Sequence, residues 1–186
     1  MKLTQVDLVA LKILTDTLVN NPCRSSLVVG LVGTLGAGKT RLCQELGRSL
    51  GMQSSEITSP TFTLIRTYEL TDRTAESQSA IPTTSTSSGM TPRRWHHLDV
   101  YRVTDEDEWW ELGIEELWDQ DRTWTILEWA DRFESLMPND ALWIEIMSGP
   151  SDKPDEREIV FRCSDPQIAE WLGGVQQEFN SRQLAR

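Results

Sequence analysis

The feature that most constrains the fold of this chain is a glycine-rich segment, Gly33–Thr40, which reads Gly-Thr-Leu-Gly-Ala-Gly-Lys-Thr. It matches the pattern G-x-x-x-x-G-K-[ST] of a phosphate-binding loop, or P-loop. The apolar run Ser26–Val32 precedes it, and leucines recur at helical spacing over 38–50. A buried strand, a glycine-rich turn and an amphipathic helix in this order predict an α/β fold with the loop at the carboxyl end of a strand.

The residue types in this loop predict that it binds the phosphates of ATP together with Mg²⁺. Glycines let main-chain N–H groups curl around an anion, and the helix N-terminus adds a partial positive charge. Lys39 is placed to reach the β- and γ-phosphates, and the Thr40 hydroxyl to ligate Mg²⁺. The alternative, a plain strand-to-helix turn, gives no reason for this lysine and threonine. The predicted nucleotide-binding residues are Gly33, Thr34, Leu35, Gly36, Ala37, Gly38, Lys39, Thr40, Arg41 and Thr61.

Two carboxylates near the ends of apolar runs are candidates for the metal and for catalysis. Glu128 closes the run Thr125–Glu128, and Asp99 lies within Trp95–Arg102. Ligands of open α/β sheets bind at the carboxyl ends of strands, where a carboxylate can hold or orient Mg²⁺. Glu128 is interpreted as a direct or water-mediated Mg²⁺ ligand, or else as a solvated acid. Asp99 is interpreted as a Mg²⁺ ligand or as the group that orients the attacking water, or else as a surface acid or ion-pair partner of Arg102.

Thr61 lies in the segment Ser59–Phe62, after the P-loop helix, where many P-loop proteins carry a loop that senses the γ-phosphate. Its hydroxyl is predicted to contact the phosphate or Mg²⁺, and the alternative is an ordinary turn before a strand. His96 and His97 are adjacent on a predicted strand, so they point to opposite faces and are not expected to share a metal ion.

Tryptophans are concentrated in one part of the chain, with seven of the eight between residues 95 and 143. Trp129 draws attention because it follows Glu128 directly. Trp109 and Trp110 point to different faces of a predicted helix, so one of them is expected to be exposed, either as a docking surface or as an ordinary exposed aromatic residue.

The length of 186 residues suits one compact domain, and we predict a P-loop ATPase domain over 1–163 with a C-terminal helix or tail over 164–186. A stretch rich in Ser, Thr and Pro predicts a flexible insertion over 72–93. The other predicted elements are a helix over 4–20 with Thr4 as N-cap, strands Ser26–Val32, Thr61–Glu69, Trp95–Tyr101 and Trp124–Trp129, a helix over 104–118 with Thr104 as N-cap, an antiparallel pair Leu142–Met147 and Glu158–Cys163, and a final helix from Asp165-Pro166.

The net charge of the chain limits the kinds of ligand that it can bind by itself. The chain has 18 basic and 29 acidic residues, a formal charge of −11, so direct, tight binding of RNA or DNA by the chain alone is not expected. An acidic chain would meet RNA beside a basic partner.

The three cysteines, Cys23, Cys43 and Cys163, are interpreted as reduced thiols without a disulfide framework or zinc cluster. No apolar run of about 18 residues and no signal-peptide pattern is present, which predicts a cytoplasmic protein without a membrane helix.

Taken together, several segments resemble the TsaE/YjeE family, the ATPase subunit of the machinery for tRNA threonylcarbamoyladenosine (t6A). The P-loop alone is unspecific, but its combination with the Ser-Pro-Thr and His-x-Asp-x-Tyr-Arg segments is highly specific. The resemblance covers roughly 3–147 in the family's order. The matching pieces are Leu35–Thr40, Ser59–Leu64, His97–Arg102, Glu111–Glu116, Leu127–Trp129 and Leu136–Pro138.

The resemblance implies a single-domain P-loop NTPase-like fold with a mixed parallel and antiparallel sheet flanked by helices. It implies a weak Mg²⁺-dependent ATPase, stimulated by a threonylcarbamoyl transferase subunit and its paralogous partner, in a complex that makes t6A at position 37 of tRNAs reading ANN codons. Turnover of ATP would reset that complex between cycles, and contact with tRNA would be indirect. By match of position, Thr40 and Glu128 ligate Mg²⁺, Thr61 is the switch threonine, and the catalytic residues are Lys39, Asp99 and Glu128.

Two features depart from the family pattern. The insertion over 72–93 is longer than the family's usual connection, and the stretch after about residue 150 carries no motif that aligns.

Two other functions use the same motif. A P-loop small-molecule kinase needs cations over the transferring phosphate, and this chain offers scattered arginines but no arginine-rich lid. A module that binds nucleotide without hydrolysis is the second alternative, and the presence of Lys39, Thr40 and Glu128 argues against it. The scattered arginines are Arg66, Arg102, Arg122 and Arg132.

Overall fold

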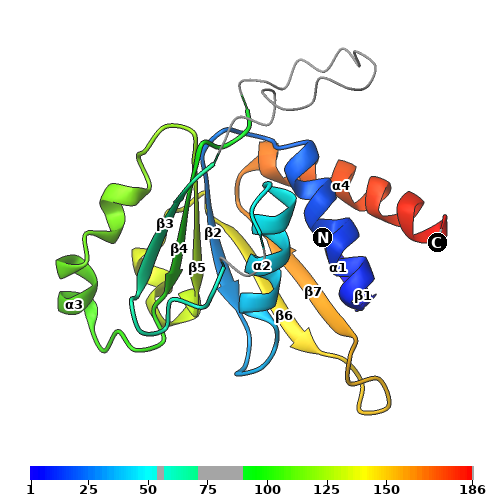
Figure 1. Cartoon of the computed structure of the whole chain (residues 1–186), viewed down its shortest axis with the longest axis horizontal. Coiled ribbons are helices and arrows are strands. Elements are labelled where there is room, and N and C mark those ends of the chain that lie inside the picture. Colours follow the sequence, from blue (N-terminus) through cyan, green and yellow to red (C-terminus); the bar gives the residue numbers. More distant parts are fainter. Residues whose placement is uncertain (54–56, 71–89, 186) are drawn as a thin grey trace.

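The computed structural model describes residues 1–53, 57–70 and 90–185. Its described strands form one seven-stranded sheet in the order β1-β7-β6-β2-β5-β4-β3, drawn in Figure 1. The strands are β1 Lys2–Val6, β2 Leu27–Val32, β3 Ile65–Glu69, β4 Arg94–Asp99, β5 Thr123–Glu128, β6 Leu142–Ser148 and β7 Arg157–Arg162. The helices are α1 Leu8–Asn20, α2 Lys39–Ser49, α3 Glu106–Glu111 and α4 Pro166–Leu184, with 3₁₀ helices η2 Ile114–Leu117 and η3 Ala130–Leu136.

The centre of the sheet is parallel and its edges are antiparallel. Strand β2 pairs in parallel with β5 and β6, and β5 pairs in parallel with β4. The pairs β1 with β7, β6 with β7 and β3 with β4 are antiparallel. This confirms the predicted α/β fold with a mixed sheet flanked by helices, including the antiparallel pairing of the last two strands. The carboxyl ends of the four parallel strands therefore lie along one edge, next to the P-loop.

Two hydrophobic clusters cover the two faces of the sheet. The larger joins buried residues of α1, α2 and α4 to alternate residues of the strands, such as Val29 and Leu31 of β2. The smaller cluster joins α3, η2 and η3 to strand residues that point to the other face of the sheet, such as Val28 and Trp143. Figure 1 shows α1, α2 and α4 together on one side of the sheet, away from α3. Side chains of successive strand residues point to opposite faces, so one strand supplies both clusters.

The segment predicted as a helix over 4–20 begins with a strand instead. Leu3 and Val6 are buried, and β1 pairs with β7, where Leu3 faces Ile159. Helix α1 starts at Leu8, and its N-cap is Asp7, whose carboxylate accepts a hydrogen bond from the amide of Ala10 at 2.8 Å. The predicted N-cap Thr4 was wrong because pairing at the sheet edge captures the first residues, and Asp7 satisfies the amides left unpaired at the helix start.

The predicted helix over 104–118 is two short helices. Helix α3 ends at Glu111, and the chain turns at Gly113, whose φ of +62° favours glycine, before η2 begins. The N-cap is Asp105, which accepts from the amide of Glu108 at 2.9 Å, so the predicted N-cap Thr104 was wrong.

Other predicted boundaries shift by a few residues. The predicted strand Thr61–Glu69 is a strand only from Ile65, because the amides of Thr63 and Leu64 both donate to the carbonyl of Pro60 in a turn. Helix α4 continues through Gly173 and Gly174, although glycine disfavours a helix interior. Trp109 is buried and Trp110 is exposed, as the spacing predicted.

Residues 72–89 of the predicted insertion over 72–93 lie outside the described residues. At its described end, the carbonyl of Thr91 accepts two hydrogen bonds from the guanidinium of Arg122, at 3.0 and 2.9 Å. The amide of Leu70 donates to the carbonyl of Arg93 at 2.8 Å. The strands on the two sides of the insertion are thus held together as the pair β3 and β4.

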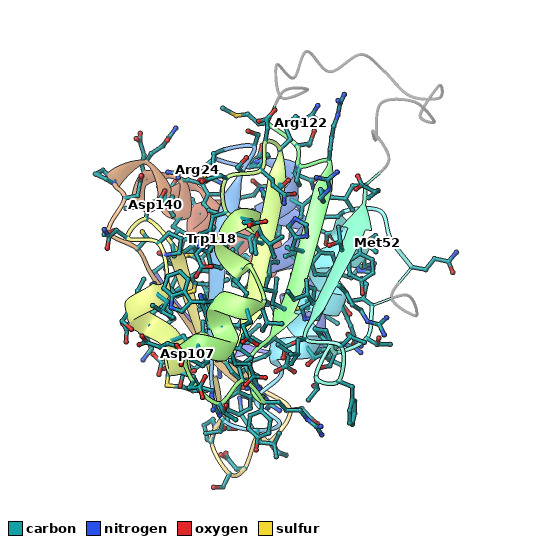
Figure 2. The ribbon with its side chains drawn as sticks, turned by 90° about the vertical axis from the view of Figure 1, so that its left-hand side faces the viewer. Arg24, Met52, Asp107, Trp118, Arg122 and Asp140 are labelled. Carbon is teal, nitrogen blue, oxygen red and sulfur yellow. The ribbon has the colours of Figure 1, made fainter. Side chains whose placement is uncertain are left out.

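Helix α4 is joined to the rest of the molecule by apolar and ionic contacts. Four of its residues belong to the larger hydrophobic cluster, namely Ile168, Leu172, Val175 and Phe179. Arg24 forms ion pairs with Asp140 and Asp165 at 2.8 Å each, next to the start of the helix, and Figure 2 labels Arg24 and Asp140. Within the described part of the chain, no helix has both the length and the apolar character needed to cross a bilayer.

Phe179→Ala tests whether α4 is part of the core or a separable tail. The side chain is 4% exposed, so the substitution is expected to lower the free energy of unfolding by about 3 kcal/mol, as measured by urea denaturation. Leu184→Ala, at a residue of the same helix that is 90% exposed, is the control and should change it by less than about 0.5 kcal/mol. Equal, small effects of both substitutions would show that α4 contributes nothing to the core.

Candidate nucleotide site

The glycine-rich loop connects the end of β2 to the start of α2, as the sequence predicted. Its backbone requires glycine at particular points. A Cβ atom at Gly33 would lie 2.5 Å from the carbonyl oxygen of Ile146, which no side chain tolerates. Gly38 has φ of +113° and is the N-cap of α2. The loop therefore passes close to β6 and turns directly into the helix.

The N-terminus of α2 has the properties of an anion-binding site. Its N-cap Gly38 has no side chain, so it cannot cap the first amides of the helix. The first turn of α2, which is fully described, contains no acidic side chain. The N–H groups and the helix dipole thus present partial positive charge that no acidic side chain of the helix's own first turn offsets.

Lys39 lies at the centre of the loop. Its Nζ atom donates hydrogen bonds to the carbonyls of Gly33 at 2.7 Å and Thr34 at 3.0 Å, and it lies 3.4 Å from the ring centroid of Trp129. Trp129 has φ of +65°, a conformation that is unusual for a residue other than glycine and that is often retained at functional sites. The ring of Trp129, the residue that follows Glu128 in the sequence, therefore covers the ammonium group of Lys39.

The charge of Lys39 is set by two opposing influences. Burial lowers the pKa of Lys39 from its ordinary value, and the negative charges of Glu128, Asp131 and Asp99 oppose that shift. A triphosphate at the loop would add further negative charge and favour the ammonium form. The site thus holds a lysine whose charge is best stabilised when an anion is close.

Glu128 is a buried carboxylate held by several donors. It ends β5, is 2% exposed, and accepts a hydrogen bond from the Thr40 hydroxyl at 2.9 Å. Its other oxygen lies 2.8 Å from Nε2 of His97. The two predicted Mg²⁺ ligands, Thr40 and Glu128, are therefore in direct contact, and the interpretation of Glu128 as a solvated acid is wrong.

His97 and Cys43 contact Glu128, and neither was predicted as a site residue. Among the described residues Nδ1 of His97 has no hydrogen-bond partner, so the contact with an ionised Glu128 requires the tautomer protonated at Nε2. Ligand atoms of Cys43, His97 and Glu128 lie within 4.8 Å of one another. Burial raises the pKa of the Cys43 thiol well above its ordinary value, and nearby Glu128 acts in the same direction. Cys43, His97 and Glu128 thus form one buried cluster next to Thr40.

The sequence held a signal for both residues. Cys43 lies four residues after Lys39, on the same face of α2, and His97 lies two residues before Asp99, on the same face of β4. His96 takes a different environment, with ring nitrogens 2.8 Å from Thr67 Oγ1 and 3.0 Å from a Gln120 oxygen. The two histidines thus point to opposite sides of the strand, as predicted.

Asp99 is a second buried carboxylate, 2% exposed at the end of β4. One oxygen accepts from the hydroxyls of Thr61 at 2.6 Å and Ser59 at 3.0 Å, and the other accepts from the amide of Tyr101 at 3.0 Å. The interpretation of Asp99 as a surface acid is wrong. Its described partners are these donors, while the guanidinium of Arg102 lies over the ring of Phe62 at 4.3 Å.

The predicted catalytic and metal-binding residues converge on one cavity of about 230 Å³. It is lined by Leu35, Gly36, Gly38, Lys39, Thr40, Arg41, Ser59, Thr61, Asp99, Glu128 and Trp129. Of the other predicted nucleotide-binding residues, Gly33 and Thr34 contribute carbonyls to Lys39, and Ala37 is fully buried at a second, adjoining cavity. Arg41 lines both cavities and forms an ion pair with Glu45 at 3.1 Å.

The donor set fits Mg²⁺ and a polyphosphate. The cavity combines hydroxyl and carboxylate oxygens, the ligands that Mg²⁺ prefers, with the lysine and helix N-terminus that favour an anion. Thr40 and Glu128 are the residues that would hold the metal, since their oxygens already meet beside the loop.

Strand β2, the glycine-rich loop and helix α2, with acidic side chains at the ends of adjacent parallel strands, define a P-loop α/β protein. The model of the threonylcarbamoyl adenosine biosynthesis protein TsaE family matches residues 9–159. The chain belongs to this family, which confirms the resemblance found in its motifs.

Individual relatives agree with this assignment. The proteins from Rickettsia bellii and Treponema pallidum, both named tRNA threonylcarbamoyladenosine biosynthesis protein TsaE, are 29% and 30% identical to this chain. The alignment with the Rickettsia bellii protein covers 68% of this chain and 72% of that protein. The alignment with the Treponema pallidum protein covers 70% of this chain and 79% of that protein. A protein of the same name from Synechocystis is 37% identical over 59% of this chain. The chain spans only 57% of that relative and about half of the Rickettsia felis relative, at 52%.

A solved structure supports the fold. The crystal structure of YdiB from Bacillus subtilis matches with a TM-score of 0.63 and 24% sequence identity. The match covers 95% of this chain and 94% of that one, so the architecture extends over nearly the whole length of both.

His97→Leu tests the contact between the histidine and Glu128. Removing the donor leaves part of a buried carboxylate without a partner, so the free energy of unfolding should fall by about 1–3 kcal/mol in urea denaturation. In the double variant with Glu128→Gln, the two effects should deviate from additivity by more than about 0.5 kcal/mol. Additive effects would show that the two side chains do not stabilise each other.

Proposed function

We propose that this chain binds ATP with Mg²⁺ in its P-loop and hydrolyses it slowly, as the nucleotide-dependent subunit of the system that makes threonylcarbamoyl adenosine in tRNA. The observation that carries the proposal is the convergence of Lys39, Thr40, Asp99 and Glu128 on one cavity at the N-terminus of α2. Membership of the TsaE family supplies the biological context.

In this proposal Lys39 and the loop amides bind the triphosphate. The lysine would exchange its hydrogen bonds to the carbonyls of Gly33 and Thr34 for hydrogen bonds to phosphate oxygens. This exchange needs only a rotation of the flexible lysine side chain. The ring of Trp129 limits the access of water to its ammonium group. Positioning and electrostatic stabilisation of this kind supply most of the catalysis in phosphoryl transfer.

Thr40 and Glu128 would hold the metal, and Mg²⁺ would neutralise charge that develops on the phosphates. His97 and Cys43 keep the Glu128 carboxylate oriented, because the imidazole donates to one of its oxygens and the thiol lies beside it. Asp99 is placed one strand away, in register with Glu128, where it orients the attacking water. The hydroxyl of Thr61, now bonded to Asp99, is the group that senses the γ-phosphate.

The proposed partners follow from the family. They are a threonylcarbamoyl transferase subunit and its paralogous partner, acting on adenosine 37 of tRNAs that read ANN codons. The formal charge of −11 supports indirect contact with tRNA, since a chain of this charge repels the phosphate backbone unless a basic partner lies between. Turnover of ATP resets the complex between cycles, and the chain works in the cytoplasm, where the tRNA modified by the complex is.

The proposal is tested by measuring phosphate release from ATP and Mg²⁺, with and without the purified transferase pair. We expect slow release by the chain alone and faster release with the pair. Lys39→Ala should abolish release in both conditions because the phosphates lose their principal cation, while Lys12→Ala, an exposed lysine of α1, should leave it unchanged. Retained activity of Lys39→Ala would remove the P-loop from the mechanism. Transfer of the phosphate to a small metabolite would instead indicate a kinase, and binding without turnover would indicate a passive nucleotide-binding module.

Glu128→Ala tests the metal role. It should lower Mg²⁺-dependent turnover by more than about tenfold, and it should raise the Mg²⁺ concentration needed for half-maximal rate. The matched control is Glu134→Ala, an exposed acid of η3 outside the cavity. A rate near that of the unmodified chain would indicate that Asp99, and not Glu128, ligates Mg²⁺.

A further inference from the structure

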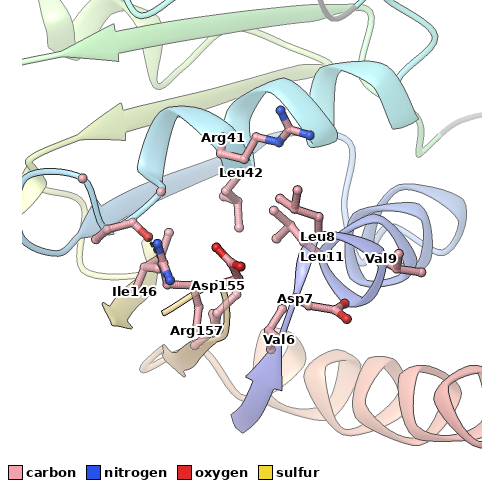
Figure 3. A pocket seen from close by; sticks show the side chains of 14 residues that line it. Val6, Asp7, Leu8, Val9, Leu11, Arg41, Leu42, Ile146, Asp155 and Arg157 are labelled. Atoms are coloured by element: carbon pink, nitrogen blue, oxygen red, sulfur yellow. Dashed lines mark hydrogen bonds between the residues drawn. The ribbon is translucent and has the colours of Figure 1, made fainter. Parts of the chain in front are cut away.

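A second cavity of about 570 Å³ adjoins the phosphate cavity on the other side of the P-loop. Three segments enclose it, namely the loop with the start of α2, the junction between β1 and α1, and the hairpin between β6 and β7 (Figure 3). The two cavities share Gly36, Gly38 and Arg41, so they meet at the P-loop. A nucleoside triphosphate with its phosphates in the first cavity would therefore extend its base into the second.

The walls of this cavity suit a flat aromatic base. They include apolar residues from all sides, with Leu8 and Val9 about half exposed at 56% and 49%. A base inserted here would cover this apolar surface, and Arg41 lies in the wall formed by α2. The volume lies within the range of ordinary small-molecule sites, and such sites select their ligands with a few polar groups in an apolar surround. The other apolar lining residues are Val6, Leu11, Leu42, Ile146 and Ile159.

The polar group that distinguishes this cavity is the carboxylate of Asp155. Figure 3 shows it turned into the space between Leu42 and the first turn of α1. The other carboxylate in the wall, Asp7, already accepts a hydrogen bond as the N-cap of α1. A carboxylate accepts hydrogen bonds and repels carbonyl oxygens, so it distinguishes an amino group from a carbonyl on the edge of a base.

We propose that Asp155 selects the base of the bound nucleotide, by accepting a hydrogen bond from the exocyclic amino group of adenine and rejecting a purine with a carbonyl oxygen at that position. This inference rests on the proposed binding of a nucleoside triphosphate at the P-loop. It assigns a role to the hairpin after residue 150, which contains no recognisable motif.

The hairpin holds Asp155 in place through a hydrogen-bonded backbone. The amide of Gly149 donates to the carbonyl of Glu156 at 2.9 Å, and the amide of Glu156 donates to the carbonyl of Lys153 at 3.1 Å. A Cβ atom at Gly149 would lie 2.6 Å from the carbonyl oxygen of Glu156, so this closure requires glycine. The backbone on both sides of Asp155 is thus held before a ligand arrives, while its side chain is exposed to the cavity mouth. A held backbone lowers the ordering cost of binding.

Arg157 connects this hairpin to the P-loop. Its Nη1 atom donates to the carbonyls of Pro154 and Glu156, the residues on either side of Asp155, at 2.5 and 2.8 Å. Its Nε atom donates to the carbonyl of Ala37 in the P-loop at 2.8 Å. One guanidinium therefore sets the distance between the loop that binds phosphate and the carboxylate that contacts the base.

The test compares the dissociation constants of ATP and inosine triphosphate, with Mg²⁺, by calorimetry on the full chain. Inosine triphosphate carries a carbonyl where ATP carries the amino group and an N1–H donor where adenine has an acceptor nitrogen, and it lacks the second amino group of GTP. The unmodified chain should bind ATP about tenfold more tightly, as expected for one charge-assisted hydrogen bond at a partly exposed site. Asp155→Asn should bring the ratio to within about threefold, because an amide can both accept and donate.

Asp152→Asn is the matched control, since it removes the same charge from the same hairpin at a residue that is exposed like Asp155 but does not line the cavity. Loss of charge alone changes the affinity for both nucleotides together, so the ratio of the two constants is the readout. An unchanged ratio in Asp155→Asn, or equal binding of both nucleotides by the unmodified chain, would overturn the role of Asp155 and leave ATP binding intact. Failure to bind either nucleotide would overturn the proposed function itself.

Discussion

The register of three parallel strands places the chemistry of this molecule. In the pairing of β2, β5 and β4, Glu128 lies opposite Leu31 on one side and opposite Asp99 on the other. Leu31 is two residues before the P-loop, so the same register brings Glu128 to the Thr40 hydroxyl at the start of α2. A shift of one residue would turn the Glu128 side chain to the other face of the sheet and separate it from Thr40, His97 and Cys43.

Burying two carboxylates and a lysine is costly unless each has hydrogen-bond partners. The carboxyl ends of the parallel strands and the nearby loops supply these partners. Glu128 receives a hydroxyl and an imidazole, Asp99 receives two hydroxyls and an amide, and Lys39 donates to two carbonyls of its own loop. Most of these donors and acceptors are small groups on loops, which can exchange partners at little cost when a polyphosphate and a metal bind. The same contacts that stabilise the fold thus prepare the site for the proposed ligand.

The sequence predicted the parts of the fold whose pattern is local. The strand, loop and helix around Gly33–Thr40, the acids at strand ends and the final antiparallel pair all follow from short-range periodicity and residue type. It failed where distant pairing decides the outcome, as at β1, which is a strand because β7 provides a partner. The stop of α3 at Gly113 also depends on a backbone conformation that helical periodicity does not reveal. The site shows the same limit, since the motifs predicted Lys39 and Glu128 but the hairpin that carries Asp155 matches no motif and reaches the P-loop only in three dimensions.

The central claim is that the P-loop, Lys39 and the oxygens of Thr40 and Glu128 form one site for a triphosphate and a divalent metal. Titration calorimetry with a non-hydrolysable ATP analogue, in the presence and absence of Mg²⁺, measures this most directly. We expect one binding site per chain, with tighter binding when Mg²⁺ is present. Well-folded protein that released or absorbed no heat with the analogue, with Mg²⁺ and the partner subunits also present, would contradict it.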